Sequence, residues 1–68
     1  MKEKYTLIGV DGNAFAIMGY VTHAMRTEGF TKEERDEYLK DAKSRDYNHL
    51  LCVSVDYIDR VNDKVRGF

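Results

Sequence analysis

The stretch Gly9-Val10-Asp11-Gly12-Asn13-Ala14-Phe15-Ala16-Ile17-Met18-Gly19 marks the place where the chain is predicted to change from an extended segment into its first helix. Asp11-Gly12 is typical of a turn, because glycine tolerates positive φ. Asn13 follows as a strong N-cap, since its side-chain oxygen can accept a hydrogen bond from an amide of the first helical turn. We therefore expect a helix to begin at about Ala14.

The segment before this turn, from about Lys4 to Val10, is rich in β-branched and apolar residues and predicts a β-strand. A single strand leaves its backbone N–H and C=O groups unpaired, so it needs a partner. Two partners fit: the C-terminal segment from Val65 to Phe68, or the same strand of a second molecule. The homodimer is slightly favoured, because closed two-fold symmetry is the commonest assembly.

Apolar residues recur at helical spacing after the turn. On a helical wheel they form one broad stripe, which consists of Ala14, Ile17, Met18, Val21 and Met25. Gly29 is placed to end this helix. Because a glycine inside a helix costs ~1 kcal/mol relative to alanine, Gly19 predicts a close approach by a neighbouring element.

A second helix is indicated by the capping-box spacing of Thr31 and Glu34. It should run from Lys32 to about Lys43. Its buried side is expected to carry Tyr38, Leu39 and Ala42.

A third helix is predicted from Tyr47 to Val61, with Asp46 as its N-cap. Its apolar residues share one broad arc of the wheel, made of Leu50, Leu51, Val53, Ser54, Tyr57, Ile58 and Val61. The segment after Val61 is expected to be frayed or recruited to the strand edge. The predicted fold is thus mainly α, with an N-terminal β-strand followed by three helices (β-α-α-α), in a single small domain of residues 1–68.

The composition indicates a cytoplasmic protein without a membrane span. Hydrophobic residues make up 43% and charged residues 34% of the chain, and no apolar run approaches the ~20 residues of a membrane helix. The charged start Met1-Lys2-Glu3 is not that of a signal peptide. The single Cys52 cannot form an internal disulfide and excludes a thiolate-rich zinc site.

The charge balance argues against nucleic acid as a partner. The net charge is −1, from 11 basic and 12 acidic residues, which gives no general attraction to phosphate. The candidates for a local basic patch are interleaved with acidic residues: Lys40, Lys43 and Arg45 lie among Asp36, Glu37 and Asp41. A helix-turn-helix built from the second and third helices stays a weak alternative, because exposed Asp56 and Asp59 would oppose phosphate.

One polar cluster is a candidate ligand site, made of Asp11, Gly12, Asn13, Asp46 and His49. Its members lie at two helix starts that are expected to be close together, and helix N-termini suit anions such as phosphate or a nucleotide. The competing interpretation is that these residues only shape a turn and cap helices. A metal site would combine one imidazole with carboxylates from turns, which is a weak pattern.

The two helix-start blocks also carry a resemblance. With Asp11-Gly12-Asn13-Ala14-Phe15 and Asp46-Tyr47-Asn48-His49-Leu50-Leu51, the chain resembles a family of very short bacterial and phage proteins that has no assigned activity and shows DGNAF and DYDHLL blocks. The resemblance covers residues 7–58 and departs at Asn48, where the family pattern has Asp. It implies a small cytosolic or phage-associated protein and implies no reaction.

These observations favour a non-enzymatic protein-interaction or regulatory module with no cofactor and no metal. Its expected partners are a second copy of the chain and a host or phage protein. The first alternative is a small protein that binds an anion, nucleotide or metal at the five-residue cluster. The second is a weak DNA-binding helical module.

Overall fold

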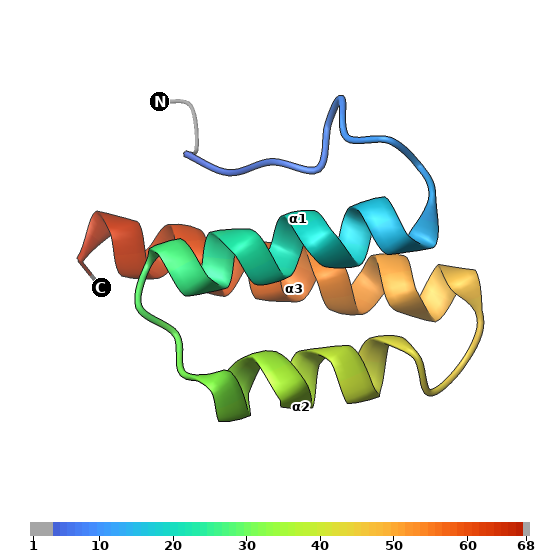
Figure 1. The fold of residues 1–68 in the computed structure, drawn as a ribbon. Coiled ribbons are helices and arrows are strands. Elements are labelled where there is room, and N and C mark those ends of the chain that lie inside the picture. The colour runs from blue at the N-terminus through green and yellow to red at the C-terminus, as the bar shows by residue number, and fades with distance from the viewer. Residues whose placement is uncertain (1–3, 68) are drawn as a thin grey trace.

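The computed structural model describes residues 4–67, which form three helices preceded by an N-terminal segment that turns at Gly9. The helices are α1 (Ala14–Thr27), α2 (Lys32–Ala42) and α3 (Tyr47–Arg66). α1 and α3 lie side by side and run in the same direction, while α2 runs the opposite way and packs against both (Figure 1). Residues 4–10, which we call the strap, lie along α1 and α3 (Figure 1).

α1 begins where the sequence predicted. The Asn13 side chain accepts a hydrogen bond from the Phe15 N–H at 2.8 Å, as expected of an N-cap. The buried face follows the predicted stripe closely and consists of Ile17, Met18, Val21, Ala24 and Met25. The expectation of a close neighbour at Gly19 is wrong, because a Cβ atom placed there would meet nothing within 4 Å.

The predicted stop at Gly29 is confirmed. Its φ is +88°, in the left-handed region that glycine adopts without a steric penalty. The N–H of Phe30 donates to the C=O of Met25 at 2.9 Å, and the N–H of Gly29 donates to the C=O of Arg26 at 3.2 Å. These two bonds make a Schellman motif, which satisfies the last carbonyls of α1 and turns the chain toward α2.

The capping box of α2 is also confirmed. The Thr31 hydroxyl accepts from the Glu34 N–H at 3.1 Å, and the Glu34 carboxylate accepts from the Thr31 N–H at 2.9 Å. Tyr38 and Ala42 are buried against the other helices, and Leu39 is half-buried. α2 is therefore a surface helix that contributes a narrow face to the core.

α3 begins with the predicted Asp46 cap but is longer than predicted. It continues past Val61 to Arg66, and Gly67, with φ of +85°, ends it in the left-handed region. The expectation of a frayed segment after Val61 is therefore wrong up to Arg66, and Phe68 lies outside the described residues. Asn62, the first residue beyond the predicted end, is a polar residue that nevertheless lies on the buried face of the helix.

The core between the helices contains one buried polar pair. Tyr38 and Ser54 are fully buried, and their hydroxyl oxygens lie 2.6 Å apart in a hydrogen bond. The Tyr38 ring also meets the Tyr57 ring edge-on, with centroids 5.1 Å apart. α2 and α3 are thus joined by a hydrogen bond inside an otherwise apolar contact, which leaves neither hydroxyl unsatisfied.

The predicted strand from Lys4 to Val10 is wrong, since residues 4–67 contain no β-strand and the fold of this part of the chain is all-α. The Asn62 carboxamide does what a neighbouring strand would do: it accepts from the Tyr5 N–H at 3.0 Å and donates to the Tyr5 C=O at 2.9 Å. The Tyr20 hydroxyl accepts from the Thr6 N–H at 3.0 Å. The backbone groups of Tyr5 and the N–H of Thr6 are therefore paired without a second strand, and residues 65–66 of the C-terminal segment belong to α3.

Candidate functional site

The first half of the predicted polar cluster builds the start of α1. Asp11 accepts a hydrogen bond from the Asn13 N–H at 2.9 Å, which closes a tight turn across Gly12. Asn13 in turn caps the helix through the Phe15 N–H. Both side chains therefore bond to backbone within their own turn.

The second half of the cluster is divided between two helices. Asp46 accepts from the His49 N–H at 2.9 Å as the cap of α3. The His49 ring points elsewhere, and its Nε2 lies 2.9 Å from Oδ1 of Asp41 in the last turn of α2. His49 thus joins the end of α2 to the start of α3, a contact across the intervening turn that no sequence signal indicated.

The structure does bring the two helix starts together, through a residue that sequence reasoning missed. The Tyr47 hydroxyl donates to the C=O of Gly12, and a Cβ atom at Gly12 would lie 3.5 Å from that hydroxyl oxygen. Within residues 4–67, no three His, Cys, Asp or Glu side chains are placed to hold a metal ion. The arrangement observed is a set of caps joined by one tyrosine.

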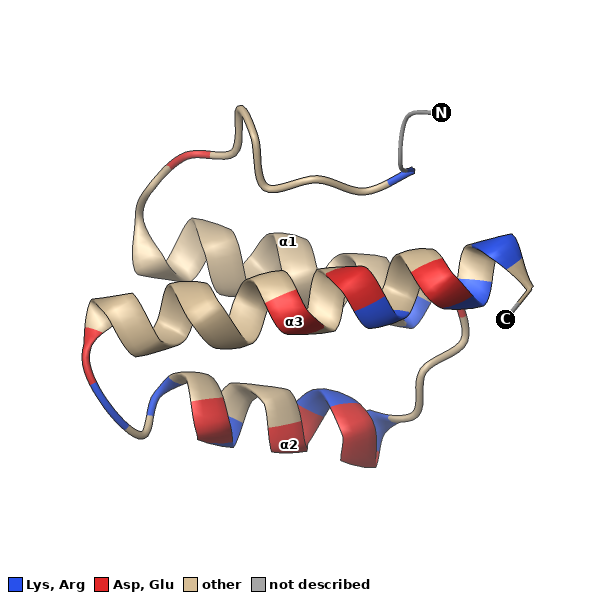
Figure 2. Cartoon of the chain, turned by 180° about the vertical axis from the view of Figure 1, so that it is seen from behind, with Lys and Arg blue, Asp and Glu red and all other residues tan. Residues whose placement is uncertain are grey.

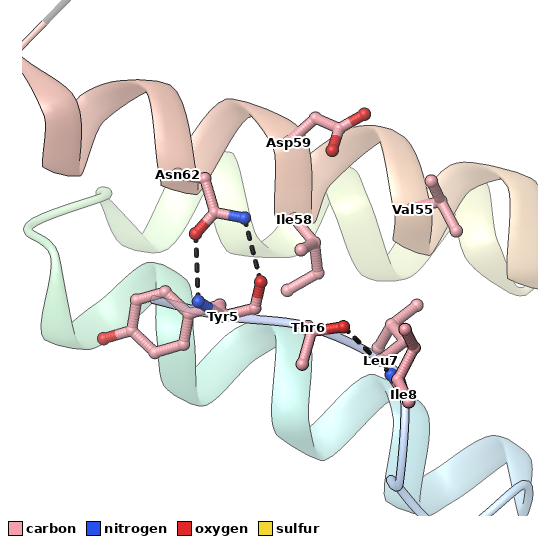
Figure 3. Close-up of a pocket in the computed structure, with 8 residues that line it drawn as sticks. All are labelled: Tyr5, Thr6, Leu7, Ile8, Val55, Ile58, Asp59 and Asn62. Carbon is pink, nitrogen blue, oxygen red and sulfur yellow. Dashed lines mark hydrogen bonds between the residues drawn. The ribbon is translucent and has the colours of Figure 1, made fainter. Parts of the chain in front are cut away.

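A different surface is hollowed, between the strap and α3 (Figure 3). This groove has a volume of about 580 Å³ and is lined by Tyr5, Thr6, Leu7 and Ile8 from the strap and by Val55, Ile58, Asp59 and Asn62 from α3. Ile8 is 88% exposed and Val55 is 50% exposed. We call it the strap groove.

The charge on the strap groove comes from one side chain. Asp59 lies at its rim, on the side of α3 away from the strap (Figure 3). Its neighbours along the helix, Asp56 and Asp63, pair with Arg60 and Arg66, whereas Asp59 has no ion-pair partner within residues 4–67. The groove therefore combines apolar walls with one carboxylate that is free to meet a cation.

The far end of the strap is fixed by a charged network. Glu28, which caps the end of α1, accepts hydrogen bonds from the Lys4 ammonium at 2.7 Å and from the Tyr5 hydroxyl at 2.6 Å. The bond from Lys4, followed by that from Tyr5, holds the pKa of Glu28 below its ordinary value. The same hydrogen bonds raise the pKa of Lys4 and of Tyr5. The position of the strap, which forms one wall of the groove, thus depends on Glu28 being charged and on Lys4 and Tyr5 being protonated.

Sequence reasoning missed the strap groove because its two walls were assigned to separate features. The strand prediction includes Ile8, and the apolar arc predicted for the third helix does not include Val55. The signal that the sequence offered was the presence of two large apolar residues, Ile8 and Val55, for which no packing partner was predicted.

Comparisons with protein-family models, with curated proteins and with solved structures found no match. Within residues 4–67, no helix has the length and apolar character needed to cross a membrane.

Proposed function

We propose that this protein is a non-enzymatic interaction module that binds a partner protein through the strap groove. The observation that carries the proposal is the exposure of Ile8 and Val55 on opposite walls of one groove, at 88% and 50%. A single exposed apolar side chain needs no explanation, but apolar residues that converge on a groove are typical of a binding surface. The helical body would serve as a rigid support for this surface.

The roles of the polar cluster support a binding function over a catalytic one. Asp11, Asn13 and Asp46 each accept a backbone N–H that begins a turn or a helix. His49 is engaged by Asp41. Side chains in such roles are held by the fold, and moving one to a substrate would break a cap worth ~1 kcal/mol.

The charge pattern supports a protein partner over nucleic acid. Along α2 and the second half of α3, acidic and basic residues alternate, and no continuous basic stripe is visible (Figure 2). A phosphate backbone is attracted by clustered positive charge. We also propose a cytoplasmic location and a bacterial or phage protein as partner, on the sequence and the resemblance alone.

The experiment is affinity capture from the native cell with matched variants. Ile8→Glu combined with Val55→Glu places charges in the strap groove without changing a buried residue. Phe15→Glu is the control, because Phe15 is 80% exposed and lies outside the groove. We expect a partner that wild type and the Phe15 variant retain and the groove variant loses. Equal retention by the groove variant would refute the proposal.

The homodimer stays a prediction with a changed basis. Its original reason, an unpaired strand, does not apply, because Asn62 satisfies the backbone of Tyr5. The surface we propose for a dimer is the strap groove, through the exposed Ile8 and Val55. Light scattering at micromolar concentration, with wild type and the double groove variant, tests this directly.

The anion, nucleotide or metal site at Asp11, Gly12, Asn13, Asp46 and His49 is the second candidate. It is favoured by the bond from Tyr47 to Gly12, which holds the starts of α1 and α3 adjacent. Thermal shift with phosphate and with divalent cations, in wild type and His49→Ala, provides the test. Stabilisation of wild type alone would support this candidate, and no shift in either protein would remove it.

A further inference from the structure

The charge on the strap groove narrows the chemistry of its partner. Resting on the proposed function, we infer that the groove binds a partner segment in which a large apolar side chain is followed by lysine or arginine. The apolar side chain enters between Ile8 and Val55, and the basic group meets the carboxylate of Asp59 at the rim. Complementary charge at the rim of an apolar contact selects between partners and speeds association.

The main support for a basic residue in the partner is that the Asp59 carboxylate forms no ion pair within residues 4–67. Asp56 is held by Arg60 at 2.9 Å, and Asp63 is held by Arg66. Asp59 has no such partner within residues 4–67 although it lies between these pairs on the same helix. An arginine or lysine brought by a ligand would therefore form an ion pair without first breaking one.

The same carboxylate argues against two other occupants. An anionic lipid surface or a nucleic acid would place negative charge beside Asp59, on a chain whose net charge is already −1. Both would be repelled at the rim. A partner with a basic residue is attracted instead.

A second copy of this chain is also a poor occupant. Among the large apolar residues exposed within residues 4–67, the one flanked on both sides by basic residues is Val65, between Lys64 and Arg66. The Lys64 ammonium already lies 4.8 Å from the centroid of the Phe30 ring, and Arg66 pairs with Asp63. Using these cations on another copy would cost the contacts they make within their own chain.

The test uses capped tripeptides titrated into the isotope-labelled protein and followed by NMR. The probes are acetyl-Ala-Leu-Arg-amide and its analogues with Gln or Glu in place of Arg. We expect all shifts to centre on residues 5–8 and 55–62, with the Arg peptide bound up to about fivefold more tightly than the Gln peptide, the range of an exposed ion pair. This preference should decrease with added salt.

Two variants assign the preference to Asp59. Asp59→Asn should abolish the difference between the Arg and Gln peptides, and Asp59→Lys should make the Glu peptide the tightest. Asp56→Asn is the control for net charge, because Asp56 does not line the groove. It should retain the preference for Arg.

The outcomes separate this inference from the proposed function. Equal binding of the peptides, or no shifts from any of them at millimolar concentration, overturns the charge preference. The proposed function then still depends on capture by wild type and its loss in the Ile8 and Val55 variant. If light scattering shows a dimer that the groove variant abolishes, the occupant is a second copy and the inference is wrong.

Discussion

The helical body and the strap are held by different kinds of interaction. In the body, Val21, Met25 and Val61 are fully buried, and the helices share one apolar core. The strap packs Tyr5, Leu7 and Val10 against the edge of this core, and it adds polar contacts, mainly from Asn62 and Glu28. Burial in the body is spread over many contacts, whereas the polar attachment of the strap depends on a few bonds. The two regions should therefore respond differently to single changes.

The largest effect is expected from a cavity in the body. Met25→Ala removes a fully buried side chain, and such changes cost about 2–5 kcal/mol. A domain of this size has a free energy of unfolding of roughly 3–10 kcal/mol. Urea unfolding followed by circular dichroism should show a strongly lowered midpoint, with the strap and helices lost together.

Phe15→Ala is the control for Met25→Ala, since Phe15 is 80% exposed. Its midpoint should change little. A Met25 variant as stable as the Phe15 variant would mean that the core does not hold the body together as described.

The next largest effect should separate the strap from the body. Asn62→Ala removes both part-buried hydrogen bonds to Tyr5, and leaving a fully buried group unpaired costs about 1–3 kcal/mol, which is an upper range for this site. The strap avoids this penalty by leaving α3, so the helix signal in circular dichroism should persist. Amide exchange at Tyr5 and Thr6 should accelerate in NMR.

Asn48→Ala is the matched control, because Asn48 is an exposed asparagine on the same helix. It should leave the strap amides as protected as in wild type. If Asn62→Ala also kept them protected, the carboxamide would not be the principal tie of the strap.

The same contrast explains which parts of the fold were predictable. The helices followed from periodic apolar residues and from local caps such as Asn13, Thr31 and Gly29, whose partners lie within a few positions in the sequence. The strap composition favoured a strand, but its partner is a side chain 57 positions away from Tyr5. No local pattern indicates such a contact, and Asn62 itself looked like the end of the helical pattern.

The candidate site was predictable only in part, for a related reason. The capping residues Asn13 and Asp46 were identified because a cap and its amide are neighbours in sequence. The contact from His49 to Asp41 and the contact from Tyr47 to Gly12 depend on how the helices pack. The strap groove depends on the strap position, so an incorrect strand assignment hid it.

A smaller effect should strengthen the body and leave the strap unchanged. Gly19 is exposed within α1 and has open space around its Cβ position, so Gly19→Ala should stabilise the protein by about 0.5–1 kcal/mol. The midpoint of urea unfolding should rise. The rate of amide hydrogen exchange in the strap, measured where exchange occurs by local opening, should not change. If Gly19→Ala destabilised the protein, we would conclude that a neighbouring element lies close to Gly19, as the sequence predicted.

The smallest effect concerns the charged tie of the strap to Glu28. Because the folded-state pKa of Glu28 lies below its ordinary value of 4.5, its contribution is present above that pH and is lost as pH falls through the folded-state pKa. At alkaline pH the docking of the strap is limited by Tyr5 and Lys4, whose pKa values are raised from ordinary values of 10.0 and 10.5. Their contribution is present below those values and is lost as pH rises through the folded-state pKa values.

The strap should therefore be docked most firmly between the acidic range in which Glu28 is protonated and the alkaline range in which Tyr5 and Lys4 lose their protons. NMR shifts of Tyr5 and Asn62 should report the release of the strap as the pH is lowered.

Glu34 titrates in a similar acidic range, because hydrogen bonds with the backbone and the hydroxyl of Thr31 lower its pKa as well. The capping box of α2 therefore also weakens as the pH is lowered. Glu28→Gln separates the two, since it should remove the acid transition at Tyr5 and keep the one at Thr31. Glu33→Gln, an exposed change on α2, should keep both. If the acid transition at Tyr5 persisted in Glu28→Gln, the strap would be tied to the body by Asn62 and Tyr20 without a contribution from the charged network.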